Sequence, residues 1–499
     1  MARSTIIFLY HELGLASLKQ TGRDAWLIIL ARCCRMFAYG TNALILALFL
    51  SSLNFSDSRI GLFMTLTLLG DVVLATLLTL VADGLGRRRT MLAGSVMMIL
   101  SGIVFALSEN FWLLLLAAVF GVISVAGGDF GPFRSIEESI LSQLTSSKTR
   151  PEVLSWYVTM ASFGSSIGTE AAGRIVDALQ KQKDWTIVDS YHGIFWVYSA
   201  MGAVNLVLVA LLSSNCELIA IATPTEESEV LLESGEQDAR EEPTPKTRTR
   251  SGWLNLAAIS SISSRTLSII LKLWFLLAID ALADGMTPIS LTTYFMDAKF
   301  DVSKATLGDI TSIGYFLAVA STIFAGPLSR RIGLINTMVF THLPSSVAVL
   351  LFPVPTNLTM TVILLFVRMG LNNMDQAPRS AFIAAVVAPE ERTAVIGLTS
   401  TIRTLASAVG PTLTGILAGH SRFWIAFVVA GALRVAYDLG LFVMFVNLKP
   451  ERPNTTELAN TERFSEDPSS VSDDESGDSF AANRSNGSTE ESRATTAVK

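Results

Sequence analysis

Long apolar runs divide the chain into two sets of six. Each run holds about 20 residues, the length that a helix needs to cross the hydrocarbon core of a membrane. The first set comprises residues 27–53, 60–82, 90–108, 111–133, 153–175 and 193–212. The second set comprises residues 267–295, 307–328, 334–352, 358–386, 395–417 and 423–446. The pattern therefore predicts an all-α membrane protein with 12 transmembrane helices.

Two polar segments interrupt and follow these runs. Residues 224–250 and 449–499 are rich in Ser, Thr, Glu and other polar residues, so neither segment has enough apolar surface to fold. We therefore expect five regions along the chain. They are a cytosolic N-terminus at 1–26, a six-helix bundle at 27–213, a disordered cytosolic linker at 214–264, a second six-helix bundle at 265–446 and a disordered acidic cytosolic tail at 447–499.

Composition supports the membrane assignment. Hydrophobic residues make up 50% of the 499 residues and charged residues only 16%, which excludes an ordinary soluble protein. The formal charge of −6 comes mainly from acidic residues in the linker and the tail, so it indicates no charged partner such as nucleic acid. Lys and Arg concentrate in alternate connections between the runs, which predicts that both chain ends face the cytosol.

A short polar break between the second and third runs contains Asp83, Gly86, Arg87 and Arg88. On its own it is an ordinary hairpin with its positive charges on the cytosolic side. It also resembles the loop signature Gly-x-x-x-Asp-x-x-Gly-Arg-Arg of the major facilitator superfamily, although Thr79 stands where the first Gly is usual.

An internal repeat strengthens the resemblance. Shifting the chain by about 245 to 247 residues superposes Gly40 on Gly285 and Gly86 on Gly333, and Asp129-x-x-Pro on Asp375-x-x-Pro. The resemblance covers about residues 27–446. It implies two pseudo-symmetric six-helix bundles that rock about a site at the membrane midplane and so transport a small molecule.

Charged residues inside the runs are costly in hydrocarbon, so each needs a partner, water or a function. Those nearest the midplane are Asp71, Asp280, Asp284, Arg35 and Arg368. A carboxylate removed from water favours its protonated form, and a nearby arginine favours its ionised form. We therefore expect Asp71 to bind and release a proton as its access to Arg35 changes, with Asp280 and Asp284 as further candidates. The alternative is a permanent ion pair between Arg35 and an aspartate that only specifies packing.

Other charged residues suggest an inner gate or local pairing. The gate candidates are Asp83, Gly86, Arg87, Arg88, Asp129, Arg134, Glu137, Asp375, Arg379 and Arg330. Two pairs at i,i+4 spacing, Glu170 with Arg174 and Arg434 with Asp438, are expected to satisfy themselves on one helix. Polar side chains that could line the cavity are Tyr39, Asn42, Arg368 and Asn373. Tyrosines in membrane helices equally fit a core or an interfacial role.

The polar segments carry short signals of a eukaryotic membrane protein. Glu227, Leu231 and Leu232 resemble an acidic dileucine sorting signal, and Ser472 precedes three acidic residues as in an acid-directed phosphorylation site. Both patterns also arise by chance. We expect a multi-pass protein of the plasma membrane, with the vacuole or another internal membrane as the alternative.

The sequence contains no motif that is typical of catalysis or of cofactor binding. It has no phosphate-binding Gly-rich motif with Lys, no metal-ligand spacing and no nucleophile with a nearby base, so we expect neither an enzyme nor a cofactor. Energy must then come from an ion gradient or from the gradient of the substrate itself, and not from bound ATP. We predict a monomeric secondary active transporter in the lipid bilayer that exports a small organic molecule against protons by alternating access. The alternatives are a nutrient uptake transporter and a transport-dead sensor on the same fold.

Overall fold

The structure is a computed structural model that describes residues 15–121, 123, 132–146, 149–217, 264–387 and 392–445. All of these belong to the first of two compact units, Met1–Pro450, and the second unit is Glu451–Lys499. The described residues form helices and short connections, without a strand. The all-α prediction is therefore confirmed for this part of the chain.

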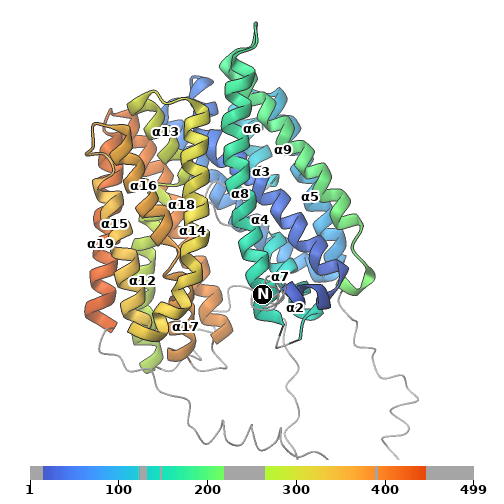
Figure 1. Ribbon diagram of the computed structural model, residues 1–499, viewed down its shortest axis with the longest axis vertical. Coiled ribbons are helices and arrows are strands. Elements are labelled where there is room, and N and C mark those ends of the chain that lie inside the picture. Colours follow the sequence, from blue (N-terminus) through green and yellow to red (C-terminus); the bar gives the residue numbers. More distant parts are fainter. Residues whose placement is uncertain are drawn as a thin grey trace, which may run out of the picture. The chain divides into compact units, whose positions relative to one another are not determined.

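The helices of each half run alongside one another (Figure 1). Those of the first half are α2 Leu15–Thr21, α3 Arg23–Ser52, α4 Asp57–Leu85, α5 Arg87–Leu107, α6 Phe111–Phe120, α7 Pro132–Leu144, α8 Arg150–Gln180 and α9 Ile187–Ala210, followed by the 3-10 turn η1 Ser214–Cys216. Those of the second half are α12 Ser264–Met286, α13 Ile289–Phe300, α14 Lys304–Ile332, α15 Leu334–Leu351, α16 Leu358–Asn372, α17 Gln376–Val386, α18 Arg392–Gly419 and α19 Phe423–Phe445.

Most predicted spans coincide with one helix. The seventh span holds α12 and α13 and the tenth holds α16 and α17, while in the fourth span α6 ends at Phe120 and α7 begins only at Pro132, so the expectation of one continuous helix is wrong at these three places. Pro288 explains one break, because its ring lacks the N–H that would continue α12 into α13. Asn373 ends α16 in another, as the first of three residues between α16 and α17.

By length and composition alone, five described helices are apolar enough to cross a membrane. They are α3, α5, α9, α15 and α19, and α6 and α16 are shorter apolar helices. Several of the remaining helices carry the ionisable residues considered below, and these lower their hydropathy. Buried charged residues therefore lie in several helices of the predicted membrane-spanning part, among them Asp71, Asp280 and Arg434.

The two halves repeat one packing scheme. Helix α3 packs against α8 and α9 as α12 packs against α18 and α19. At the first crossing a Cβ on Gly40 would lie 2.3 Å from the carbonyl oxygen of Ser165, and at the equivalent crossing a Cβ on Gly285 would lie 1.9 Å from that of Ser407. The helices meet here backbone to backbone, which only glycine permits.

The two copies of the loop signature also adopt one geometry. Gly86 precedes α5 with φ of 94°, and Gly333 precedes α15 with φ of 90°. Residues with side chains rarely adopt such angles, so glycine is needed at both turns. The internal repeat read from the sequence thus appears in the backbone.

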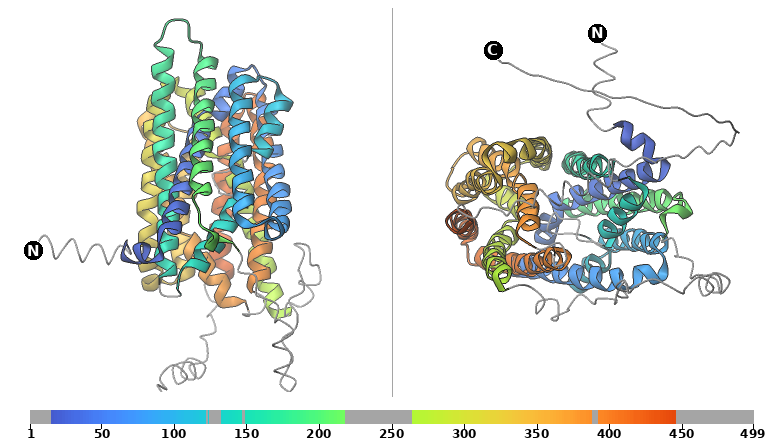
Figure 2. Two further views of the ribbon diagram at one scale, coloured as in Figure 1. Left: turned by 90° about the vertical axis from the view of Figure 1, so that its right-hand side faces the viewer. Right: turned by 90° about the horizontal axis from the view of Figure 1, so that it is seen from below.

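Contacts between the halves lie toward the side that is predicted to face outward. Helix α4 packs against α18, and α8 against α14. The hydroxyls of Thr65 and Thr412 lie 2.7 Å apart, and Tyr294 donates a 2.7 Å hydrogen bond to Asp57 near the start of α4. These contacts hold the outer ends of the two halves together. The right-hand view of Figure 2 shows the helices of the first half, coloured blue to green, and those of the second half, coloured yellow to red, end-on.

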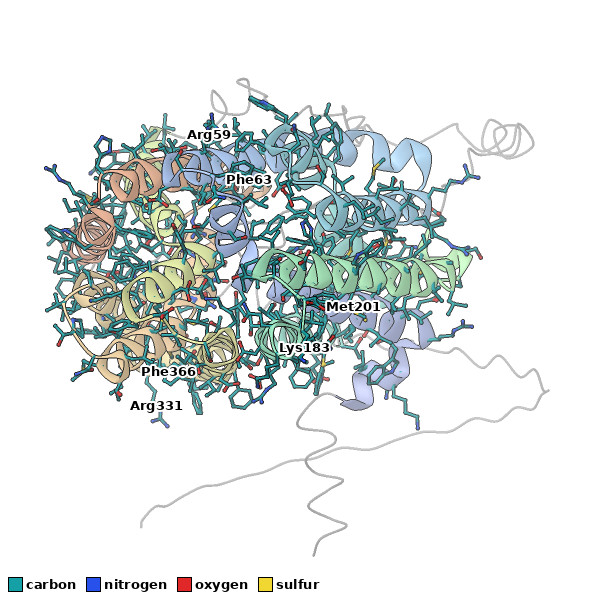
Figure 3. All side chains as sticks on the ribbon, turned by 90° about the horizontal axis from the view of Figure 1, so that it is seen from above. Arg59, Phe63, Lys183, Met201, Arg331 and Phe366 are labelled. Carbon is teal, nitrogen blue, oxygen red and sulfur yellow. The ribbon has the colours of Figure 1, made fainter. Side chains whose placement is uncertain are left out.

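Aromatic side chains fill the core of the first half at its outer end. Phe63 of α4 is fully buried, with its ring centroid 6.4 Å from that of Phe105 and 5.7 Å from that of Phe111. Figure 3 shows Phe63 among the side chains between the helices, whereas the exposed Arg331 of α14 points away from them. This packed outer core provides a rigid frame for the charged residues deeper in each half.

Candidate functional site

Arg35 of α3 is held in a closed network within the first half. Its Nη2 lies 2.5 Å from Oε2 of Glu137 on α7, and the Tyr157 hydroxyl donates to the same oxygen at 2.8 Å. Its Nη1 donates to Oδ1 of Asn205 at 3.2 Å, and the Asn205 amide donates to the Ser95 hydroxyl at 2.7 Å. The ion pair described for Arg35 is thus with a glutamate, and the expected pair between Arg35 and an aspartate stays a prediction. Glu137, expected at the gate, is its partner.

Asp71 of α4 is buried without a partner. Only 4% of the surface of Asp71 is exposed, and among the described residues neither of its carboxylate oxygens has a hydrogen-bond partner. It lies near enough to Tyr198 of α9 for an electrostatic interaction, but the Tyr198 hydroxyl donates to the backbone carbonyl of Gly121 at 3.1 Å. Asp71 is thus a solitary acid in a helix that borders the other half.

A larger charged cluster occupies the second half and centres on Asp280 of α12. Four nitrogen atoms surround its carboxylate at 3.7 to 3.9 Å, a range compatible with ion pairing but too long for direct hydrogen bonds. They belong to His342 of α15, Arg379 of α17, Arg403 of α18 and Arg434 of α19. Asp280 itself is 1% exposed.

Most members of this cluster also have a closer partner. Arg379 lies 2.9 Å from Asp375, and Arg434 lies 3.1 Å from Asp284. Asp284 is the more accessible acid, with a side chain that is 33% exposed. The expected i,i+4 ion pair between Arg434 and Asp438 is not found among the described contacts, because each of these residues contacts a residue of another helix.

His342 was not singled out by the sequence, and it links α15 to α19. Arg434 donates to its Nε2 at 3.0 Å, so Nδ1 carries the proton and donates to Asp438 at 2.8 Å. The Ser346 hydroxyl, one turn along α15, donates to the other oxygen of Asp438 at 2.6 Å. The only sequence signal for this contact was a histidine and a serine four residues apart inside an apolar run.

The gate candidates at the inner end make contacts within their own half. The Arg87 side chain donates to Gln143 of α7 at 2.9 Å, and the Arg88 side chain donates to the Ala210 carbonyl at the end of α9. The backbone N–H groups of Arg87 and Arg88 donate to the carboxylate of Glu217, at 2.8 and 3.2 Å. Glu217 thus satisfies the start of α5, where an anion is favoured. The sequence analysis did not select it.

The other gate candidates are dispersed. Arg134 pairs with Glu138 at 2.7 Å on an exposed face of α7, Asp375 pairs with the buried Arg379, and Arg330 is exposed near the end of α14. The side chain of Asp83 and the whole of Asp129 lie outside the described residues. The inner gate therefore stays a prediction.

The cavity candidates occupy different surroundings. The hydroxyls of Tyr39 on α3 and Tyr315 on α14 lie 3.4 Å apart, and this contact joins the two halves. Asn42, one turn further along α3, is 1% exposed, and its amide has no partner among the described residues. Arg368 of α16 donates to Thr287 and Thr292, which fixes it to the break between α12 and α13. Asn373 accepts a 3.1 Å bond from Gln376 at an exposed position.

The remaining candidates cannot be placed. The sorting candidates Glu227, Leu231 and Leu232, and the phosphorylation candidate Ser472, lie outside the described residues.

A hollow of about 660 Å³ opens between the halves on the predicted outer side. It is lined by residues from α3, α8, α9, α13 and α14. Its rim holds Asp177, Lys181 and Asp301, and the ion pair between Asp297 and Lys304 closes one side. This hollow is separate from the buried clusters around Arg35 and Asp280.

Comparisons with known proteins agree on one family. The model of the Major Facilitator Superfamily matches residues 28–271 and 273–483. A protein of Saccharomyces cerevisiae described as an uncharacterized membrane protein, YJR124C, is 32% identical over 432 residues, which cover 86% of this chain and 96% of the yeast protein.

Solved structures show the same fold at low sequence identity. The nucleoside transporter NupG is 13% identical with a TM-score of 0.63, and the alignment covers 86% of this chain and all of NupG. The inward-open xylose transporter XylE of E. coli is 13% identical with a TM-score of 0.63, over 87% of this chain and 99% of XylE. These likenesses confirm the predicted arrangement of two pseudo-symmetric bundles.

Proposed function

The chain belongs to the major facilitator superfamily and is a membrane transporter of a small molecule, and we propose that it couples export of that molecule to protons through Asp71. The observation that carries the proposal is the burial of the Asp71 carboxylate without a hydrogen-bond partner among the described residues. An ionised carboxylate in such a place costs several kcal/mol, so this environment favours the protonated acid.

A change of access would let Asp71 release the proton. Helix α4, which carries Asp71, packs against α18 of the other half, so rocking of the halves alters the surroundings of this helix. When water or a cation reaches the carboxylate, the ionised form is stabilised and the proton leaves. Arg35 already has Glu137 as its partner, so it need not be the group that receives Asp71.

We propose export because an apolar cavity lining with few fixed charges beyond the proton candidates suits an organic compound that leaves the cell. The cluster around Asp280 limits this condition to the first half. We propose the plasma membrane as the location, since an exporter discharges its substrate there. One copy suffices, because both halves belong to one chain.

The test is flux in proteoliposomes that contain the purified full-length protein and carry an imposed pH gradient. Candidate substrates are screened on the wild type and then on Asp71→Asn. We expect the wild type to accumulate substrate against its gradient, and Asp71→Asn to equilibrate substrate without accumulating it. The sign of the wild-type flux relative to the proton gradient gives the direction.

A matched control is Asp184→Asn in the exposed turn between α8 and α9. It removes one carboxylate away from the clusters and should behave as the wild type. Undiminished accumulation by Asp71→Asn would exclude this residue as the coupling site and leave Asp280 as the next acid to test. If no compound moves in the wild type, the transport-dead sensor is favoured instead.

A further inference from the structure

Arg403 of α18 differs from the other cations around Asp280. Arg379, Arg434 and His342 each have an acidic partner of their own at 2.8 to 3.1 Å. Among the described residues, Arg403 has only the shared contact with Asp280 at 3.9 Å, and its Nε is buried without a hydrogen-bond partner. A guanidinium has five N–H donors, so most of the bonding capacity of Arg403 is unused.

The Arg403 side chain is also accessible, with 32% of its surface exposed. From Leu405 onward, the exposed apolar residues of α18 lie on one face of the helix, and they are Leu405, Val409, Leu413 and Ile416. At about 100° per residue, Arg403 lies roughly 120° away from the middle of that stripe. It shares a face with Thr399, which accepts a hydrogen bond from Trp274 of α12, and with Ser407, which meets Gly285. Arg403 therefore lies on the side of α18 that packs against α12, away from Leu405 and the other exposed residues that follow it.

This combination is suited to an anion. Burying a cation deep in a membrane protein is costly unless it is paired, and Asp280 divides its charge among four neighbours. A carboxylate that enters beside Arg403 can accept two parallel N–H bonds, the geometry that guanidinium groups favour. The position near the middle of α18 is where substrates of alternating-access transporters bind.

We propose that Arg403 binds the carboxylate of the transported molecule, so that the substrate is an organic anion. This inference rests on the proposed transport function and names the chemical class of its substrate. Asp280 then acts as a positioning residue, because it holds the guanidinium in place until the substrate carboxylate arrives.

Binding is measured without any gradient, on the purified full-length protein in detergent. Thermal unfolding is followed with a fixed panel of monocarboxylates, benzoate, phenylacetate, hexanoate and 2-hydroxybutyrate, each against its neutral amide. We expect at least one carboxylate to raise the melting temperature with a saturable concentration dependence, while its amide does not. In Arg403→Gln that carboxylate should bind about 30-fold more weakly or not at all.

Two variants serve as controls. Arg331→Gln removes an exposed arginine outside the cluster and should leave carboxylate binding unchanged. Arg403→Lys keeps the charge but loses the planar fork, and it should weaken binding by an intermediate factor. It replaces Arg403→Gln as the test if that variant does not fold as judged by size-exclusion chromatography.

The inference is overturned if no carboxylate of the panel shifts the wild type, if the amides shift it equally, or if the Arg403 variants keep wild-type affinity. Such a result leaves the proposed function intact as long as the pH gradient still drives accumulation of a neutral compound. Loss of accumulation in Asp71→Asn together with normal carboxylate binding supports both proposals independently.

Discussion

Replacing Glu137 should destabilise the protein more than any change at a surface ion pair. Oε2 of Glu137 serves both Arg35, at 2.5 Å, and the Tyr157 hydroxyl, at 2.8 Å, and the residue is fully buried. Glu137→Leu removes the carboxylate that pairs with the buried Arg35 guanidinium, while the bond from Arg35 to Asn205 stays in place.

The magnitude follows from the two contacts. Removing one member of a buried ion pair costs about 3–5 kcal/mol, because the charge left behind has no compensation. Loss of the bond from the tyrosine hydroxyl adds about 1 kcal/mol. We therefore expect Glu137→Leu to lower the free energy of unfolding by about 4–6 kcal/mol. Arg35→Met with Glu137→Leu should cost less than Glu137→Leu alone, since the buried charge of Arg35 is then removed together with its partner.

The assay is reversible unfolding in mixed micelles, followed by circular dichroism, on the wild type, both single variants and the double variant. A coupling energy of about 2 kcal/mol or more indicates a packing role for the pair. Two single effects that add to within about 0.5 kcal/mol would refute this reasoning. The exposed pair between Arg134 and Glu138 supplies a comparison, and Glu138→Leu should change stability by less than about 1 kcal/mol.

Two further predictions concern helix crossings and the contact between the halves. Gly285→Ala should lower the unfolding free energy by about 1–3 kcal/mol, because the new Cβ would lie 1.9 Å from the Ser407 carbonyl oxygen. Gly397→Ala, with nothing within 4 Å of its Cβ, should be neutral in the same titration, and equal losses in both variants would contradict the crossing argument. Tyr315→Phe should raise labelling of a cysteine at Ser58 from the outer side about threefold, because a hydroxyl contact between the halves is lost. Labelling is measured with Cys33, Cys34 and Cys216 replaced, and Tyr198→Phe, which changes a contact within one half, should leave the rate unaltered.

The helices could be predicted from the sequence because the hydrophobic thickness of a membrane fixes their length. The repeat was also readable, since Gly86 and Gly333 mark turns that require positive φ. The breaks within three spans were missed because apolar residues lie on both sides of each break, although polar residues such as Asn373 and Asp375 occupy the one between α16 and α17. Pro288 was visible in the sequence, but proline also occurs inside membrane helices, as Pro411 does in α18.

The partners of the charged residues could not be predicted, because they depend on which helices are neighbours and how each is rotated. The exposed pair of Glu170 with Arg174 forms as expected, and Arg174 forms a second ion pair with Asp309 of α14 at 3.0 Å. Arg434 and Asp438 have the same spacing, but both are fully buried and lie against α12 and α15, whose polar groups take them. Spacing along one helix thus predicts ion pairs at the surface better than in the interior.

The charged residues do not follow the repeat, and this difference bears on how the halves divide their work. The glycines that set the helix crossings and turns are duplicated, so both halves keep one scaffold. The repeat places Ala318 opposite Asp71, and Asp280 opposite Arg35, so each half carries different charges on that scaffold.

In our proposals the proton site lies in the first half and the anion site in the second. Proton and substrate then do not compete for one residue, and the coupling between them has to pass through the contacts of α4 with α18. Neutralising Asp71 should therefore abolish accumulation without changing the affinity for a carboxylate. Neutralising Arg403 should lower the affinity for a carboxylate and leave the protonation of Asp71 unchanged.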